Sequence, residues 1–297
     1  MSAVYDYLRA AAIVVAFFAA RQSKKSALSF DLYLSAWFGA GCFLFPRFVA
    51  SKIFVSSDHS HVFGVQTVGA SFITMALFQY LCNKSRDETV LGSISVSKAL
   101  GFLPLLFASV YTFVMNQKSF HHPAFCFILT IFSGIWLINV ALLFEIRPAI
   151  GRREHGGPVS VVCRLMFLVF LLHGLADLAF PSTVASIMKV KSSVGLNFLT
   201  QSIGALLISN IFTSWYAPCF LRKEDRKSFI DSQLVYELLV ALASGYFCYM
   251  TKADTSATLL FVAHSLAGML LPVVGCVLMY REDHVITNTH YTRSKRN

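Results

Sequence analysis

Apolar stretches of roughly 20 residues alternate with short polar connections along most of the chain. A helix of about 20 residues crosses the hydrocarbon core of a bilayer. The apolar residues are continuous within each stretch, whereas barrel strands alternate, so the pattern predicts spanning helices. The predicted spans are 28–46, 62–82, 96–115, 123–144, 161–181, 194–215, 233–250 and 255–280.

A shorter apolar stretch at 8–20 precedes these spans. It follows Asp6 and Arg9, and its leading end lacks the basic character of a secretory signal peptide. The length fits either a short spanning helix or a helix lying at the interface. The sequence therefore predicts eight or nine spans, preceded by a hydrophobic N-terminal segment at 1–27.

The chain also repeats itself at a fixed offset of 135 residues. Twelve of the 32 positions in 39–70 are identical to those in 174–205 without a gap. Shared residues include Gly39 and Gly174, Pro46 and Pro181, and Gly69 and Gly204. A constant offset defines an architectural unit, here a block of about 120 residues present twice.

The offset predicts an all-α polytopic membrane protein made of two tandem four-helix bundles. Because each unit has an even number of spans, both units enter the membrane in the same direction, which makes the repeat parallel. The predicted units are 28–146 and 161–281. A cytoplasmic linker rich in Gly, Pro and charge joins them at 147–160, and a basic cytoplasmic tail follows at 282–297.

Composition supports a lipid environment, since 56% of the residues are hydrophobic and only 13% are charged. The net charge of +10 does not indicate nucleic acid, because the basic residues are distributed by side of the membrane. Alternate connections, with the tail, carry 18 Lys and Arg residues, and the opposite connections carry six. By the positive-inside rule the linker and the C-terminus are cytoplasmic. The 18 are counted in 21–31, 83–98, 146–164, 221–231 and 281–297.

Seven cysteines lie within or beside apolar spans without CxxC spacing, and small packing residues are the simplest interpretation. We expect no disulfide framework, no metal and no cofactor. No HExxH, GxSxG or glycine-rich phosphate loop is present in the sequence, so we predict that the protein is not an enzyme and has no catalytic residue.

Candidate ligand-binding residues are the polar groups inside the spans, where ionisable side chains are costly. His173 and Asp177 are four residues apart on one helix face, where they could hold a polar ligand, relay protons, or form an internal ion pair with Arg47. His264 is a second candidate that could equally be a packing residue. We expect Glu237 near the cytoplasmic surface, where its cost is small.

Gln66 and Gln201 stand at equivalent positions of the two units, three residues before Gly69 and Gly204. An amide at this place could bond to a neighbouring helix as packing glue, or it could contact a ligand. The glycines would let helix backbones approach closely.

The C-terminal residues Arg293 and Lys295 resemble a dibasic retrieval signal of endoplasmic reticulum membrane proteins. The alternative is a basic tail that anionic lipid attracts.

The four-helix unit, with a glycine in its first helix, a proline ending that helix and Gly69 or Gly204 in the second, resembles the DoxX-like group of small four-helix membrane proteins. The resemblance implies a bundle in each half. It transfers no catalytic residue, because the group includes both redox-associated proteins and receptor-assembly factors.

Three functions remain open from the sequence. The first is binding or transport of a small lipophilic or amphipathic molecule at the interface of the two repeats, with His173, Asp177, Arg47 and His264 as its lining. The second is an assembly or trafficking factor that docks a membrane-protein client through small residues. The third, an intramembrane enzyme acting on a lipid, would need more converging polar groups than the chain supplies.

Overall fold

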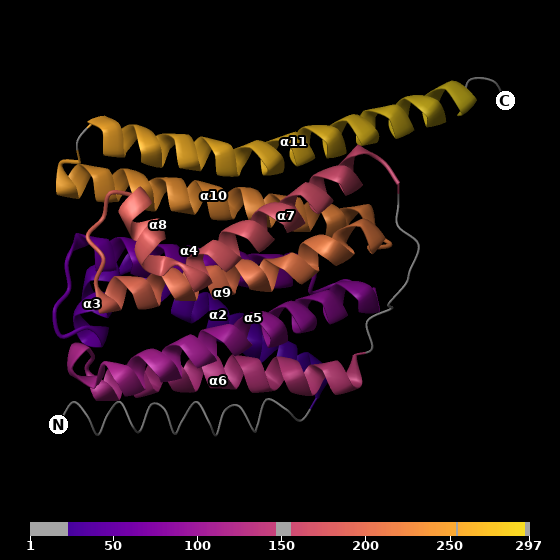
Figure 1. Cartoon of the computed structure of the whole chain (residues 1–297). Coiled ribbons are helices and arrows are strands. Elements are labelled where there is room, and N and C mark those ends of the chain that lie inside the picture. Colours follow the sequence, from indigo (N-terminus) through magenta and orange to yellow (C-terminus); the bar gives the residue numbers. More distant parts are fainter. Residues whose placement is uncertain (1–22, 147–155, 254, 295–297) are drawn as a thin grey trace.

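The computed structural model describes residues 23–146, 156–253 and 255–294. The N-terminal stretch at 8–20, most of the predicted linker and Lys295 lie outside these residues. The helices run roughly side by side along one long axis (Figure 1). They are α2 (Lys24–Leu44), α3 (Pro46–Ile53), α4 (His59–Leu81), α5 (Glu88–Met115), α6 (His122–Glu145), α7 (Pro158–Ala179), α8 (Pro181–Ile187), α9 (Val194–Tyr216), α10 (Lys223–Thr251) and α11 (Thr255–Ser294).

Eight of these helices are long and apolar enough to span a bilayer, counting only the described residues. They are all of the above except the short α3 and α8. The protein is therefore an all-α, multi-pass membrane protein. No strand is formed in the described part of the chain, which has one isolated bridge, between Phe54 and Phe120.

Two spans begin earlier than the apolar pattern predicts. α5 starts at Glu88 rather than 96, and α10 starts at Lys223 rather than 233. Both added segments, 88–95 and 223–232, carry charged residues and serines, which lower the average hydropathy although they continue the helix. Asp87 caps α5, where its side chain accepts a hydrogen bond from the amide of Thr89 at 3.0 Å.

Each proline at the end of a first span also opens a short helix. α2 ends at Leu44 and α3 begins at Pro46, and in the same way α7 ends at Ala179 and α8 begins at Pro181. Proline is favoured at a first helical position because it has no amide proton to satisfy there. The predicted tail at 282–297 is also helical as far as Ser294, as the continuation of α11.

The core of the molecule lies along α4 and α9, which are the two most buried spans. α2 packs along α4, and α7 packs along α9. Other extensive contacts cross between the halves of the chain, because α5 packs along α9 and α10 packs along α4. The two halves are thus interlocked through their central helices.

Glycines set the closest helix approaches. A Cβ at Gly69 would lie 2.6 Å from the backbone nitrogen of Phe43, and a Cβ at Gly204 would lie 2.7 Å from the carbonyl oxygen of Gly174. α2 against α4 and α7 against α9 therefore cross at backbone contact, as small residues permit in membranes.

Candidate functional site

Gln66 and Gln201 each donate a hydrogen bond to a backbone carbonyl of a neighbouring helix. The Nε2 amide of Gln66 donates to the carbonyl of Phe43 at 3.5 Å, and that of Gln201 donates to the carbonyl of Leu178 at 3.3 Å. Each bond joins two helices beside a glycine crossing. This geometry fits the first of the two interpretations of the Gln-x-x-Gly pair, in which the amide stabilises the packing of two helices.

His173, Asp177 and His264 come together on one side of the second half. The Nε2 atom of His173 lies 3.6 Å from Oδ2 of Asp177, one turn further along α7. The ring of His264, from α11, stands edge-on to the His173 ring with centroids 5.4 Å apart. Asp177 is 3% exposed, and its Oδ1 atom has no hydrogen-bond partner among the described residues.

Glu237 joins this cluster from α10, and its predicted place near the cytoplasmic surface is wrong. It stands 14 residues after Lys223, about 21 Å along the helix and near its middle. A Cβ at Gly268 would lie 2.2 Å from its Oε2 atom, so the carboxylate rests on α11. His264 lies one turn before Gly268 and therefore on the same face of α11.

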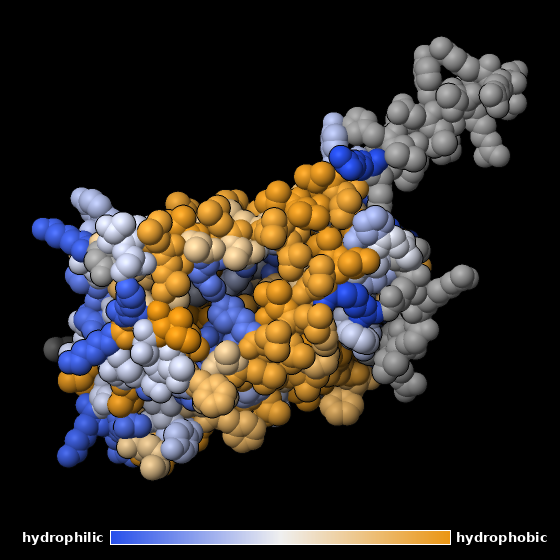
Figure 2. Space-filling model, turned by 45° about the horizontal axis from the view of Figure 1, so that its top comes forward, coloured by the Kyte–Doolittle hydropathy of each residue, from blue (hydrophilic) through white to orange (hydrophobic). Residues whose placement is uncertain are grey.

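Figure 2 turns the top of Figure 1, where α10 and α11 lie, toward the reader. Figure 2 shows hydrophobic residues over the middle of this face and hydrophilic residues gathered toward the two ends. Within the hydrophobic area a hollow opens, and hydrophilic atoms are visible inside it. The polar residues described above on α7, α10 and α11 are His173, Asp177, Glu237 and His264, which we call the second-half polar cluster.

Arg47 does not join the second-half polar cluster. It is exposed on α3, and its guanidinium lies 6.0 Å from the centre of the Tyr246 ring on α10. No ion pair links it to Asp177 within the described ranges. The expected polar lining between the two halves is thus replaced by a cluster that α7, α10 and α11 supply from the second half alone.

A second group of charged residues, which the sequence did not single out, is buried in the first half. Lys98 on α5 donates to Oδ2 of Asp31 at 2.7 Å, to Oε1 of Gln79 at 2.9 Å and to Oγ of Ser35 at 3.3 Å. Lys98 is 2% exposed and Asp31 is 0% exposed. We call these four residues the Lys98 cluster. The assignment of Lys98 to a cytoplasmic connection is wrong. The excess of basic residues in these connections remains when Lys98 is left out of the count.

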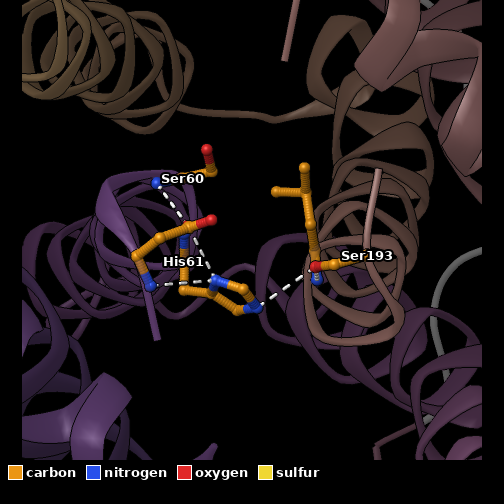
Figure 3. Close-up of polar contacts among 5 residues, drawn as sticks. Ser60, His61 and Ser193 are labelled. Carbon is orange, nitrogen blue, oxygen red and sulfur yellow. Dashed lines mark hydrogen bonds and ion pairs between the residues drawn. The ribbon is translucent and has the colours of Figure 1, made fainter. Parts of the chain in front are cut away.

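The beginnings of α4 and α9 are joined through His61 (Figure 3). Its Nδ1 atom lies 2.8 Å from Oδ1 of Asp58, and its Nε2 atom lies 3.2 Å from Oγ of Ser193. Asp58 and Ser193 are the N-cap residues of α4 and α9, and both also accept backbone amides. Asp, His and Ser also make up catalytic triads, but Asp58 and Ser193 already have a role here as helix N-caps.

Asp58 stands outside the spans, at the start of α4. Its partial burial raises the pKa of the carboxyl. Hydrogen bonds from the side chain and amide of His61 and from the amide of Ser60 lower this pKa by more than burial raises it. The net result is a pKa below the usual value. The carboxylate is therefore charged at neutral pH, as an N-cap that meets the positive end of a helix dipole should be.

No group of three or more His, Cys, Asp or Glu side chains that could hold a metal ion is present in the described part of the chain. All seven cysteines are free. The described polar groups can bind by hydrogen bonding and charge, and they can exchange protons at carboxylate and imidazole atoms.

The comparisons with known proteins show the family. The family model described as "Domain of unknown function (DUF8292)" matches residues 29–280, which include both halves and every predicted spanning helix from 62 onward. The chain belongs to this family. No curated protein and no solved structure matches the chain, so the resemblance to DoxX-like proteins stays a prediction.

Proposed function

We propose that this membrane protein arose by tandem duplication of a four-helix unit and that its second unit binds a small amphipathic molecule from the bilayer. The helix bounds support the duplication. α4 spans 59–81 and α9 spans 194–216, so both ends differ by 135 residues. The starts of α5 and α10, at 88 and 223, differ by the same number. This is the offset of the sequence match.

The proposed site rests on a difference between equivalent positions of the two units. In the first unit four phenylalanine rings pack together, with centroid distances of 4.8 to 6.1 Å. In the second unit the equivalent residues are a histidine, a leucine, a glutamate and an alanine. The phenylalanines are Phe38, Phe72, Phe102 and Phe132, and their counterparts are His173, Leu207, Glu237 and Ala267.

This exchange removes ring volume and adds polar atoms at the same place. We assign the hollow with hydrophilic atoms that Figure 2 shows to this place in the second unit. Two small residues, Ala267 and Gly268, follow one another on α11, and the Glu237 carboxylate lies against Gly268. The meeting of His173, Asp177 and His264 on one side of the second unit is the single observation that carries the proposal.

The chemistry of the second-half polar cluster favours an amphipathic ligand. Leu172, next to His173 on α7, and Leu266, two residues after His264 on α11, are more than 60% exposed, so exposed apolar side chains adjoin the cluster. A lipid-like molecule could reach the hollow sideways from the bilayer. A hydroxyl or amine of this molecule would form hydrogen bonds with the carboxylate and imidazole groups of the cluster. Ionisable groups inside a membrane commonly serve such a binding role.

The test restores the first unit's residues in the second unit. We expect the double variant His173→Phe and Ala267→Phe to fold normally and to lose the ligand, because the rings fill the hollow. Native mass spectrometry of the purified protein should show about tenfold less bound amphiphile than wild type. A decrease of this size corresponds to the loss of one or two charge-assisted hydrogen bonds.

The control is Leu165→Phe, which enlarges an exposed side chain of the same helix about two turns away from His173. It should keep the ligand. Equal ligand content in wild type, control and double variant would contradict the proposal. Recovery of a stoichiometric protein client in place of any small molecule would instead favour the assembly-factor alternative.

Two further assignments remain proposals. Basic residues gather at the end of the bundle that holds the starts of α2 and α10, and this bias supports a cytoplasmic C-terminus. Retrieval to the endoplasmic reticulum rests on Arg293 and Lys295, and the described residues end at Ser294.

A further inference from the structure

A pocket of about 380 Å³ lies between α10 and α11, about two turns along both helices from the second-half polar cluster. Its polar lining is Lys227 and Asp231 from α10 with Cys276 and Tyr280 from α11. Ile230 and Met279, both at most 2% exposed, supply apolar walls. Sites for small molecules begin at about 300 Å³, so a group larger than water fits here.

The two charges of this pocket are opposite and one helical turn apart. Lys227 and Asp231 are spaced i, i+4, which places their Cβ atoms about 5–6 Å from each other on one face of α10. Among the described residues, the ion pairs join other side chains, and none joins Lys227 to Asp231. Cys276 donates its thiol to Oδ1 of Asp231 at 3.6 Å and so holds the carboxylate against α11. Both charges therefore remain available to a ligand.

The pocket stands at the depth of lipid headgroups. Lys227 lies four residues after Lys223, the first residue of α10, where Arg222 and Arg226 also stand. Tyr280 is 65% exposed and precedes Arg281, near the end of the apolar part of α11. α11 then continues beyond its neighbours (Figure 1). Tyrosine and basic side chains at such a level are typical of the membrane interface.

We propose that this pocket binds the headgroup of a zwitterionic phospholipid, with the phosphate at Lys227 and the ammonium at Asp231. In ethanolamine and choline lipids two carbon atoms separate the phosphate ester from the ammonium, so both charges fit within one helical turn. Ile230 and Met279 would contact the glycerol and the first acyl carbons. An anionic lipid would satisfy Lys227 but would bring no cation to Asp231.

The inference is independent of the ligand proposed for the second-half polar cluster. Its test titrates phosphatidylethanolamine or phosphatidylglycerol into the purified, detergent-solubilised full chain and measures lipid retention by native mass spectrometry. We expect wild type to retain the ethanolamine lipid more strongly than the glycerol lipid. Asp231→Asn should abolish this preference, and Lys227→Gln should weaken retention of both lipids about tenfold.

The matched control is Lys25→Gln, which removes an exposed lysine of α2 at the same end of the bundle. It should change neither lipid's retention. A thermal melt of each variant establishes that it is folded, as expected because Lys227 is exposed and Asp231 is partly exposed. Preference for the anionic lipid in wild type, or equal retention in wild type and both pocket variants, would overturn the proposal.

Discussion

Lys98→Met is expected to lower the free energy of unfolding by about 3–5 kcal/mol, the usual cost of removing one partner of a buried ion pair. The methionine fills similar space but leaves the Asp31 carboxylate with no cation at a position that is 0% exposed. It also removes the donor to Gln79 and Ser35. Unfolding in mixed micelles, followed by circular dichroism, measures the loss.

The second half suggests the compensating variant. Residues equivalent to Asp31 and Lys98 are Met166 and Gln233, so nature has already built this position without the ion pair. Asp31→Met with Lys98→Gln should therefore be markedly more stable than Lys98→Met alone. If the double variant is as unstable as the single one, an uncompensated carboxylate is not the cause of the loss.

Gly101→Leu is expected to destabilise the protein by at least about 3 kcal/mol, at the upper end of overpacking effects. A Cβ at Gly101 would lie 2.4 Å from Cβ and 2.6 Å from Cα of Ser209. Because the contact is with backbone, no change of rotamer relieves it, and α5 must move away from α9. Thermal unfolding of the purified variant measures the effect.

Gly245→Leu is the matched control for this change. Gly245 is also inside a spanning helix, but a Cβ there meets nothing within 4 Å. Leucine is a better helix former than glycine, so stability should stay equal or rise. Equal losses in both variants would show that the close approach of α5 and α9 does not limit stability.

The apolar pattern was sufficient to predict eight spanning helices, because a bilayer demands long apolar stretches with internally satisfied backbones. It misplaced the starts of α5 and α10, where charged and serine-rich turns continue the helix. The same averaging assigned Lys98 to a connection. A hydropathy window cannot distinguish a charge in a loop from a charge that Asp31, Ser35 and Gln79 surround inside the protein.

Part of the candidate site could be predicted from the sequence and part could not. The spacing of His173 and Asp177 predicts a shared helix face, and the two side chains lie 3.6 Å apart. His264 and Glu237 reach the same place from other helices, and no local spacing in the sequence reports such a meeting. The equivalents of His173 and Glu237 in the first half, Phe38 and Phe102, are the sequence signal that could have found the cluster.

The interlocking of the two halves also lay beyond the sequence. Apolar patterns predict two units but do not say which helices of one unit contact the other. The small residues Gly101 and Ser209 mark the crossing of α5 and α9, where Ser97 and Thr213 also form a 2.7 Å hydrogen bond. Their meaning becomes clear only once the helices are placed together.

The most direct measurement of the proposed ligand site in the second unit is photo-crosslinking in native membranes. A diazirine amino acid is placed at His264 in one sample and at the equivalent residue of the first unit, Leu129, in another. Mass spectrometry of the adducts should find one dominant amphiphile at 264 and a mixture of bulk lipids at 129. The same bulk-lipid mixture at both positions would contradict a selective site.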